Sequence, residues 1–134
     1  MTERRALPRG IRIAQLIWIA GFLVGTTTHI ADLVFGGSDV YSGYPDAVRL
    51  FWVSLTVLDP LAVVLIALRS RAGVPLGVLI MIADVAVNLS VAATIGGLSL
   101  FGLVNQSLFC AFVLITARPL WRAFSTRTTP APHG

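Results

Sequence analysis

The sequence predicts an all-α integral membrane protein: a four-helix bundle of up-down-up-down topology with both termini in the cytoplasm. Hydrophobic residues make up 56% of the chain and charged residues only 12%, a balance outside the usual range of soluble proteins. The apolar residues form four continuous segments, and nine of the ten arginines lie outside them on one predicted side. Continuous apolar runs favour helices, because strands of a membrane barrel would alternate apolar and polar residues.

Each apolar segment is close to the roughly 20 residues that a helix needs to cross the hydrocarbon core. We expect spans at about residues 13–35, 50–68, 74–95 and 98–117. The first run is longer than the roughly 7–15 apolar residues of a secretory signal, which favours a retained span. The transmembrane domain is therefore predicted over residues 1–122, with a disordered cytoplasmic tail at 123–134.

The connections carry residues typical of turns and interfaces. The first connection is the longest and contains Tyr41 and Tyr44, which suit the headgroup level, so we expect it to form a partial lid on the outer surface. A short turn follows the second span, and Gly96-Gly97 turns the chain back into the fourth. Pro119 is expected to close the fourth helix.

The arginines set the predicted orientation. Because positive residues are retained in the cytoplasm, both termini and the second connection are expected inside. Only Arg49 is expected on the outer side, together with Asp39 and Asp46. The net charge of +4 therefore reports topology and attraction to anionic lipid, not nucleic-acid binding. We therefore predict a multi-pass protein of the cell membrane, specifically of a bacterial inner membrane.

Ionisable residues inside the predicted spans are the main functional signal. Asp59 and Asp84 fall near mid-depth, and His29 and Asp32 fall in the outer third of the first span, with no lysine or arginine at comparable depth. A carboxylate at the centre of a span costs about 2.5–3.5 kcal/mol, so these groups imply a polar site inside the bundle. The polar residues of all four spans lie at overlapping heights, which predicts one cavity open to the outside.

Two roles follow for the residues of this predicted cavity. Two mid-depth carboxyl groups without a positive partner cannot both be comfortably charged, so one is protonated or awaits a cationic ligand. A neutral acid can donate a proton, and a charged one can stabilise a developing positive charge. The catalytic candidates are Asp59, Asp84, His29 and Asp32. The substrate-binding candidates are Thr28, Trp52, Thr56, Asn88, Asn105 and Gln106.

The polar residues of the spans also have a purely structural interpretation. Polar residues in membrane bundles also act as interhelical hydrogen-bonding groups, each contributing about 0.6 kcal/mol. His29 and Asp32 could likewise form a satisfied interfacial pair with Arg49 nearby. His29, Asp32 and Asp84 match no specific metal-ligand spacing, so no metal is expected. No cofactor is expected either, because the sequence contains no phosphate-binding loop, dinucleotide fingerprint, CxxC or nucleophile elbow.

Two short motifs carry a resemblance to a known family. His29-Ile30-Ala31-Asp32 lies late in the first span, and Asp59-Pro60 lies in the second. This arrangement resembles the EXPERA group of four-helix membrane proteins, the group of the emopamil-binding sterol isomerase and the sigma-2 receptor. This chain departs from the family pattern at two points. The acid of the second span is displaced toward the proline, and the acid of the first span is an aspartate. The resemblance implies a pocket for a sterol-like molecule or cationic amphiphile, with His29, Asp32 and Asp59 as its polar end.

The predicted function is therefore to bind or isomerise a lipophilic small molecule that enters from the membrane. The sequence leaves open whether a reaction is catalysed. It keeps two alternatives: a proton-coupled carrier or channel for a small solute, and a structural subunit of a membrane complex. The expected partners are a lipophilic small molecule and membrane lipid, with no nucleic acid, and a homo-oligomer is left open.

Overall fold

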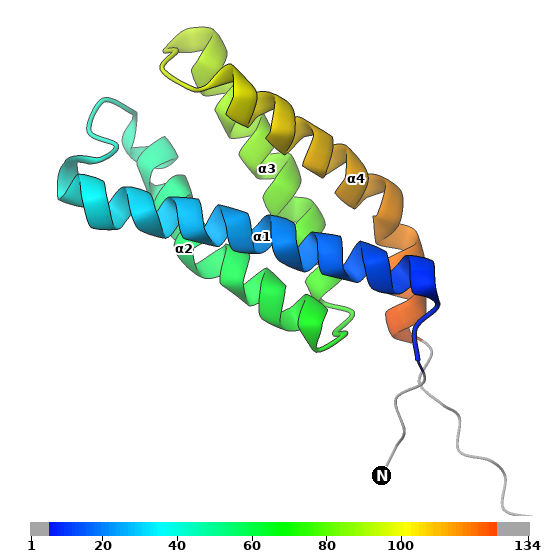
Figure 1. Ribbon diagram of the computed structural model, residues 1–134. Coiled ribbons are helices and arrows are strands. Elements are labelled where there is room, and N and C mark those ends of the chain that lie inside the picture. Colours follow the sequence, from blue (N-terminus) through cyan, green and yellow to red (C-terminus); the bar gives the residue numbers. More distant parts are fainter. Residues whose placement is uncertain (1–5, 126–134) are drawn as a thin grey trace, which may run out of the picture.

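The computed structural model describes residues 6–125, and within that range it contains four α-helices, a short 3-10 helix and no strands (Figure 1). All four α-helices are long and apolar enough to cross a membrane. The predicted all-α class and the four apolar spans are therefore confirmed. The elements are α1 (Arg9–Gly36), η1 (Gly37–Asp39), α2 (Asp46–Ala67), α3 (Gly73–Thr94) and α4 (Leu100–Ser125).

Helix α4 is longer than the sequence suggested. It continues through Pro119 to Ser125, so the expectation that Pro119 closes the helix was wrong. A proline removes only the hydrogen bond to the carbonyl four residues back, and the helix can continue with a bend at that point. Figure 1 shows such a bend in the orange part of α4. Leu120 and Phe124 are buried in the core and hold the last turns in place.

This extension also moves the boundary of the predicted tail. Residues 123–125 belong to α4, and residues 126–134 lie outside the described part of the chain. A second proline inside a helix, Pro60 in α2, likewise does not end it.

The helices pack in a closed arrangement in which each has two neighbours. α1 contacts α2 and α4, and α3 contacts the same two helices. The largest fully buried side chains come from α1, α2 and α4. They are Trp18, Phe22, Leu55, Ile66, Val113 and Leu120.

The outer surface of the bundle is apolar. Large hydrophobic side chains such as Val34, Leu50, Val57, Leu79 and Ile115 are exposed on it. A soluble protein rarely exposes so much contiguous apolar surface, whereas hydrocarbon tails solvate it readily. The surface thus fits a protein surrounded by lipid.

The two ends of the bundle differ in chemistry. At one end, which we call the arginine end, α1 begins and α4 finishes (Figure 1). Here Arg71 Nε donates a 2.6 Å hydrogen bond to Ser125 Oγ, and its guanidinium lies 5.3 Å from the centre of the Trp121 ring. Described arginines at this end are Arg9, Arg12, Arg69, Arg71, Arg118 and Arg122.

At the opposite end, which we call the tyrosine end, the first and third connections meet. A Cβ atom at Gly97 would lie 2.9 Å from the Tyr44 hydroxyl, and Gly97 has a φ of +83°. Both the backbone conformation and the close tyrosine therefore require glycine there.

Candidate functional site

The two acids of the second and third spans lie inside the bundle. Asp59 in α2 is 5% exposed and Asp84 in α3 is 7% exposed. Each stands on the helical stripe that also carries core residues: Leu55 and Ala62 flank Asp59, and Ile80 precedes Asp84 by one turn. The two carboxyl groups are close enough to interact electrostatically. The helical spacing in the sequence therefore brings two acids into one core.

Asp84 is held by amide side chains. Gln106 of α4 donates through Nε2 to one carboxyl oxygen, and Asn88 donates through Nδ2 to the other over 3.2 Å. The same Asn88 nitrogen also donates to Gln106 Oε1 over 2.9 Å. Both oxygens of Asp84 thus accept N–H groups, an arrangement that suits an ionised carboxylate.

A tryptophan extends this network to a third helix. Trp52 Nε1 in α2 donates to Asn88 Oδ1 over 2.8 Å. Since an indole N–H is only a donor, it fixes the Asn88 amide with its oxygen toward α2 and its nitrogen toward Asp84. The amide network, defined as Trp52, Asp84, Asn88 and Gln106, therefore joins α2, α3 and α4. These four were all site candidates from the sequence.

Asp59 has a different environment. Within residues 6–125, no protein group donates a hydrogen bond to its carboxyl, and no arginine pairs with it. Instead α1 approaches it through Gly25, where a Cβ atom would lie only 2.5 Å from Asp59 Oδ2. A buried carboxyl with neither a donor nor a cation is strongly disfavoured as an anion, so it needs a proton or a positive partner.

Aromatic rings cover the amide network at the tyrosine end. The rings of Tyr41 and Tyr44 lie 4.9 and 4.8 Å from the Trp52 ring, measured between centroids. The Tyr41 hydroxyl donates to Asp32 Oδ2 over 2.9 Å. Burial, helped by the neighbouring Asp32, raises the pKa of Tyr41 and keeps it a donor. This aromatic cover, Tyr41, Tyr44 and Trp52, occupies the place where the sequence predicted a partial lid.

Neither His29 nor Asp32 shares a hydrogen bond with Asp59 or Asp84 among the described residues. His29 is half-buried, and its Nδ1 is fully buried without a hydrogen-bond partner. Asp32 is exposed and bonds Tyr41, while Arg49 pairs with Asp46 over 3.4 Å. Among the described residues, the structure thus contains no hydrogen-bonded pair of His29 with Asp32 and no ion pair of Asp32 with Arg49.

Three further candidates bond only to their own helices. Thr28 donates to Gly25 O over 2.9 Å, Thr56 to Val53 O over 2.7 Å, and Asn105 to Phe101 O over 2.8 Å. None of them joins the amide network. Their role in binding a ligand stays a prediction.

Sequence reasoning did not place Gly25 and Tyr41 in the site. Gly25 does lie one helical turn before His29 on the stripe Gln15, Trp18, Phe22, Gly25, His29. This stripe is expected to face protein, and the small residues Gly21 and Gly25 are expected to let another helix approach closely, but the spacing does not identify Asp59 as the neighbour. Tyr41 lies in a connection, and no periodicity relates it to Trp52.

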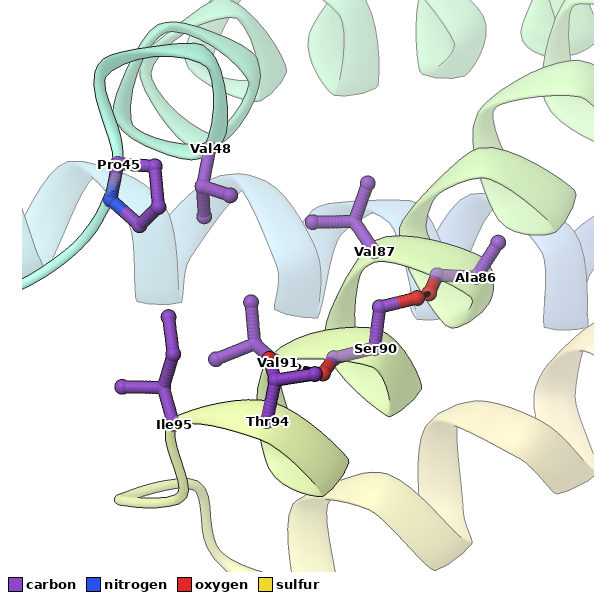
Figure 2. A pocket seen from close by; sticks show the side chains of 8 residues that line it. All are labelled: Pro45, Val48, Ala86, Val87, Ser90, Val91, Thr94 and Ile95. Carbon is purple, nitrogen blue, oxygen red and sulfur yellow. Dashed lines mark hydrogen bonds between the residues drawn. The ribbon is translucent and has the colours of Figure 1, made fainter.

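Two hollows at the tyrosine end lie away from the acids. The first, of about 310 Å³, lies between the start of α2 and the end of α3 (Figure 2). Pro45 and Val48 face Val91 and Ile95 across it, and the hydroxyls of its polar residues bond their own backbone. The second, of about 350 Å³, lies between the end of α1 and the start of α2. Neither is lined by Asp59 or Asp84, so an outward-opening cavity at these acids stays a prediction.

Comparison of the chain with protein-family models, with curated proteins and with solved structures finds no match. Within residues 6–125, no three His, Cys, Asp or Glu side chains are grouped to hold a metal ion. Cys110 is a free, buried thiol. The chemistry that the geometry supports is therefore that of two carboxyl groups in unlike surroundings.

Proposed function

We propose that this small multi-pass membrane protein binds a lipophilic cation, with its positive group at Asp59. One observation carries this proposal: Asp59 is buried, accepts no hydrogen bond from residues 6–125 and has no arginine beside it. A cation supplied by a ligand would complete the site electrostatically. The ligand must also be apolar, because the surrounding core and the lipid are apolar.

Asp84 strengthens the attraction for a cation. The amide network holds it in a form that suits a negative charge, and it lies within electrostatic range of Asp59. In the isomerising version of this function, Asp59 gives and takes a proton on an apolar substrate while the Asp84 carboxylate stabilises the intermediate cation. The resemblance to the EXPERA group agrees with such a ligand class.

We also propose an orientation of the bundle in the membrane. The described arginines gather at the arginine end, where α1 begins and α4 finishes. Positive residues favour the cytoplasm, so this end is proposed to lie inside and the tyrosine end outside. A ligand would then reach Asp59 from the outer leaflet, past the aromatic cover.

The unpaired Asp59 also favours a second candidate, a proton-coupled carrier. A carboxyl that needs either a proton or a cation can exchange one for the other. The two candidates differ in whether the exchange moves solute across the membrane.

Binding of tetraphenylphosphonium to the purified protein in detergent tests the proposal. We expect saturable binding that strengthens from about pH 5 to about pH 9, because protons compete with the cation for the acid. Asp59→Asn should abolish it. Asp39→Asn is the matched control, because this exposed residue loses the same charge and lies outside the core.

The outcomes separate the candidates. Equal affinity in wild type and Asp59→Asn, with no dependence on pH, would overturn the binding proposal. Uptake of the cation into proteoliposomes driven by an imposed pH gradient, and lost in Asp59→Asn, would identify the carrier.

A further inference from the structure

The second hollow combines one arginine and one aspartate with apolar side chains, and neither Asp59 nor Asp84 lines it. It lies at the tyrosine end, between the end of α1, the first connection and the start of α2. Its volume is about 350 Å³. Its lining contains charged and aromatic groups as well as aliphatic side chains. The lining residues used below are Leu33, Tyr41, Asp46, Arg49, Leu50 and Val53.

Arg49 is the cation of this hollow, and most of its donors are free. Its side chain is 37% exposed, and only Nη1 contacts Asp46, at 3.4 Å. This distance is longer than the roughly 2.7–2.9 Å of a strong charged hydrogen bond. A guanidinium carries five N–H donors in a planar fork that matches phosphate, so Arg49 retains donors for an anionic oxygen.

The lining residues that follow Arg49 in α2 are apolar and exposed on the bundle surface. Leu50 is 72% exposed and Val53 is 39% exposed, and Leu33 of α1 lines the opposite wall. Val53 lies seven residues after Asp46 in α2, which places it roughly 10 Å further along the helix axis. A molecule bound to Arg49 would thus continue into hydrocarbon, as a glycerophospholipid does.

Charge at this end disfavours an acidic lipid. The described charged residues here are Asp32, Asp39, Asp46 and Arg49, three acids to one base. Asp46 is exposed beside Arg49, with one carboxyl oxygen outside the ion pair. A primary ammonium can donate hydrogen bonds to that carboxylate, whereas a quaternary ammonium has no N–H to donate.

We propose that this hollow binds a zwitterionic phospholipid with a primary ammonium headgroup, its phosphate on Arg49 and its ammonium on Asp46. The acyl chains lie along Leu33, Leu50 and Val53. Tyr41 borders the headgroup and also belongs to the aromatic cover, so an occupied hollow supports the packing of that cover on Trp52.

Native mass spectrometry of the full chain tests this assignment. The protein is equilibrated in detergent with equal amounts of phosphatidylethanolamine, phosphatidylcholine and phosphatidylglycerol of identical acyl chains. We expect phosphatidylethanolamine to be retained several-fold over the other two. Arg49→Gln should lose this retention, and Asp46→Asn should reduce phosphatidylethanolamine to the level of phosphatidylcholine.

Controls keep the result independent of folding and of the proposed cation site. Arg118→Gln removes the same charge at the arginine end and should retain the preference, and a thermal melt of each variant verifies that it is folded. Asp59→Asn should also retain it, even where it loses tetraphenylphosphonium. Unchanged retention of phosphatidylethanolamine in Arg49→Gln overturns the proposal. A preference for phosphatidylglycerol that Arg118→Gln lowers as much as Arg49→Gln also overturns it.

Discussion

Trp52 Nε1 donates a 2.8 Å hydrogen bond to Asn88 Oδ1, and this bond links the aromatic cover at the tyrosine end to the buried Asp84. The contacts run from Asp32 through Tyr41 to Trp52, and from Asn88 to Asp84 and Gln106. A continuous chain of contacts therefore joins the exposed Asp32 to the buried Asp84.

Replacing Trp52 with Phe should destabilise the protein. Phenylalanine keeps an aromatic ring, but the half-buried Asn88 loses the donor to its Oδ1. The loss should cost at most the roughly 1–3 kcal/mol of a fully buried unsatisfied polar group. Thermal unfolding in detergent measures the loss. Trp121→Phe, at the exposed Trp121 ring of the arginine end, serves as the control and should change stability less. Equal melting of both variants would argue against a structural role for the Trp52 bond.

Asp59→Asn and Asp84→Asn should have different effects on stability. Asp59 accepts no hydrogen bond from the described protein, so its replacement removes an ionisable group and should leave stability level or raise it by about 1 kcal/mol. Asp84 accepts from two amides, and loss of hydrogen bonds to a charged acceptor should cost about 1.5–3 kcal/mol. Paired thermal melts compare them. Similar shifts in both variants would show that the two acids have equivalent surroundings.

Gly25→Ala should weaken the contact between α1 and α2. The new methyl group would lie 2.5 Å from Asp59 Oδ2, so the helices must separate or the carboxyl must turn, at a cost of about 1–3 kcal/mol. Gly10→Ala in the same helix has open space around it and should be neutral or slightly stabilising. Comparison of the two melts measures the effect, and an unchanged Gly25→Ala variant would refute this packing.

Alkaline pH should destabilise the aromatic cover through Tyr41. Burial and Asp32 raise the pKa of Tyr41 in the folded protein, so the unfolded chain releases this proton first as pH rises. The stabilisation is fully present below the ordinary tyrosine pKa of about 10 and is lost progressively above it. Thermal melts from about pH 8 to about pH 11 should therefore fall more steeply for wild type than for Tyr41→Phe. Parallel profiles would contradict this expectation.

The proposed orientation is open to a labelling test in intact cells. Ser42→Cys in the first connection should react with an impermeant thiol reagent, because the tyrosine end is proposed to face outward. Ala72→Cys in the exposed second connection should react only after the membrane is permeabilised. The native Cys110 is buried and provides the background. The reverse labelling pattern would invert the proposed topology.

Composition and the four continuous apolar segments were sufficient for the fold class. Hydropathy is a property of the residues themselves, so four apolar helices followed directly from the sequence. The free-energy cost of a carboxylate at mid-depth of a span placed Asp59 and Asp84 inside the bundle before any contact was known. The absence of a nearby cation in the sequence likewise raised the question of how they are neutralised.

Tertiary packing decided which polar groups meet. Spacing in the sequence treats the two acids alike, yet Gln106 and Asn88 reach Asp84, while Gly25 brings bare backbone against Asp59. The same holds for Tyr41, which binds Asp32 and Trp52 because a connection folds back over the bundle. At Pro119 local preference predicted a helix end, but burial of Leu120 and Phe124 favours a bent, continued helix. Each of these outcomes depends on contacts between distant residues, whose free energies no local pattern contains.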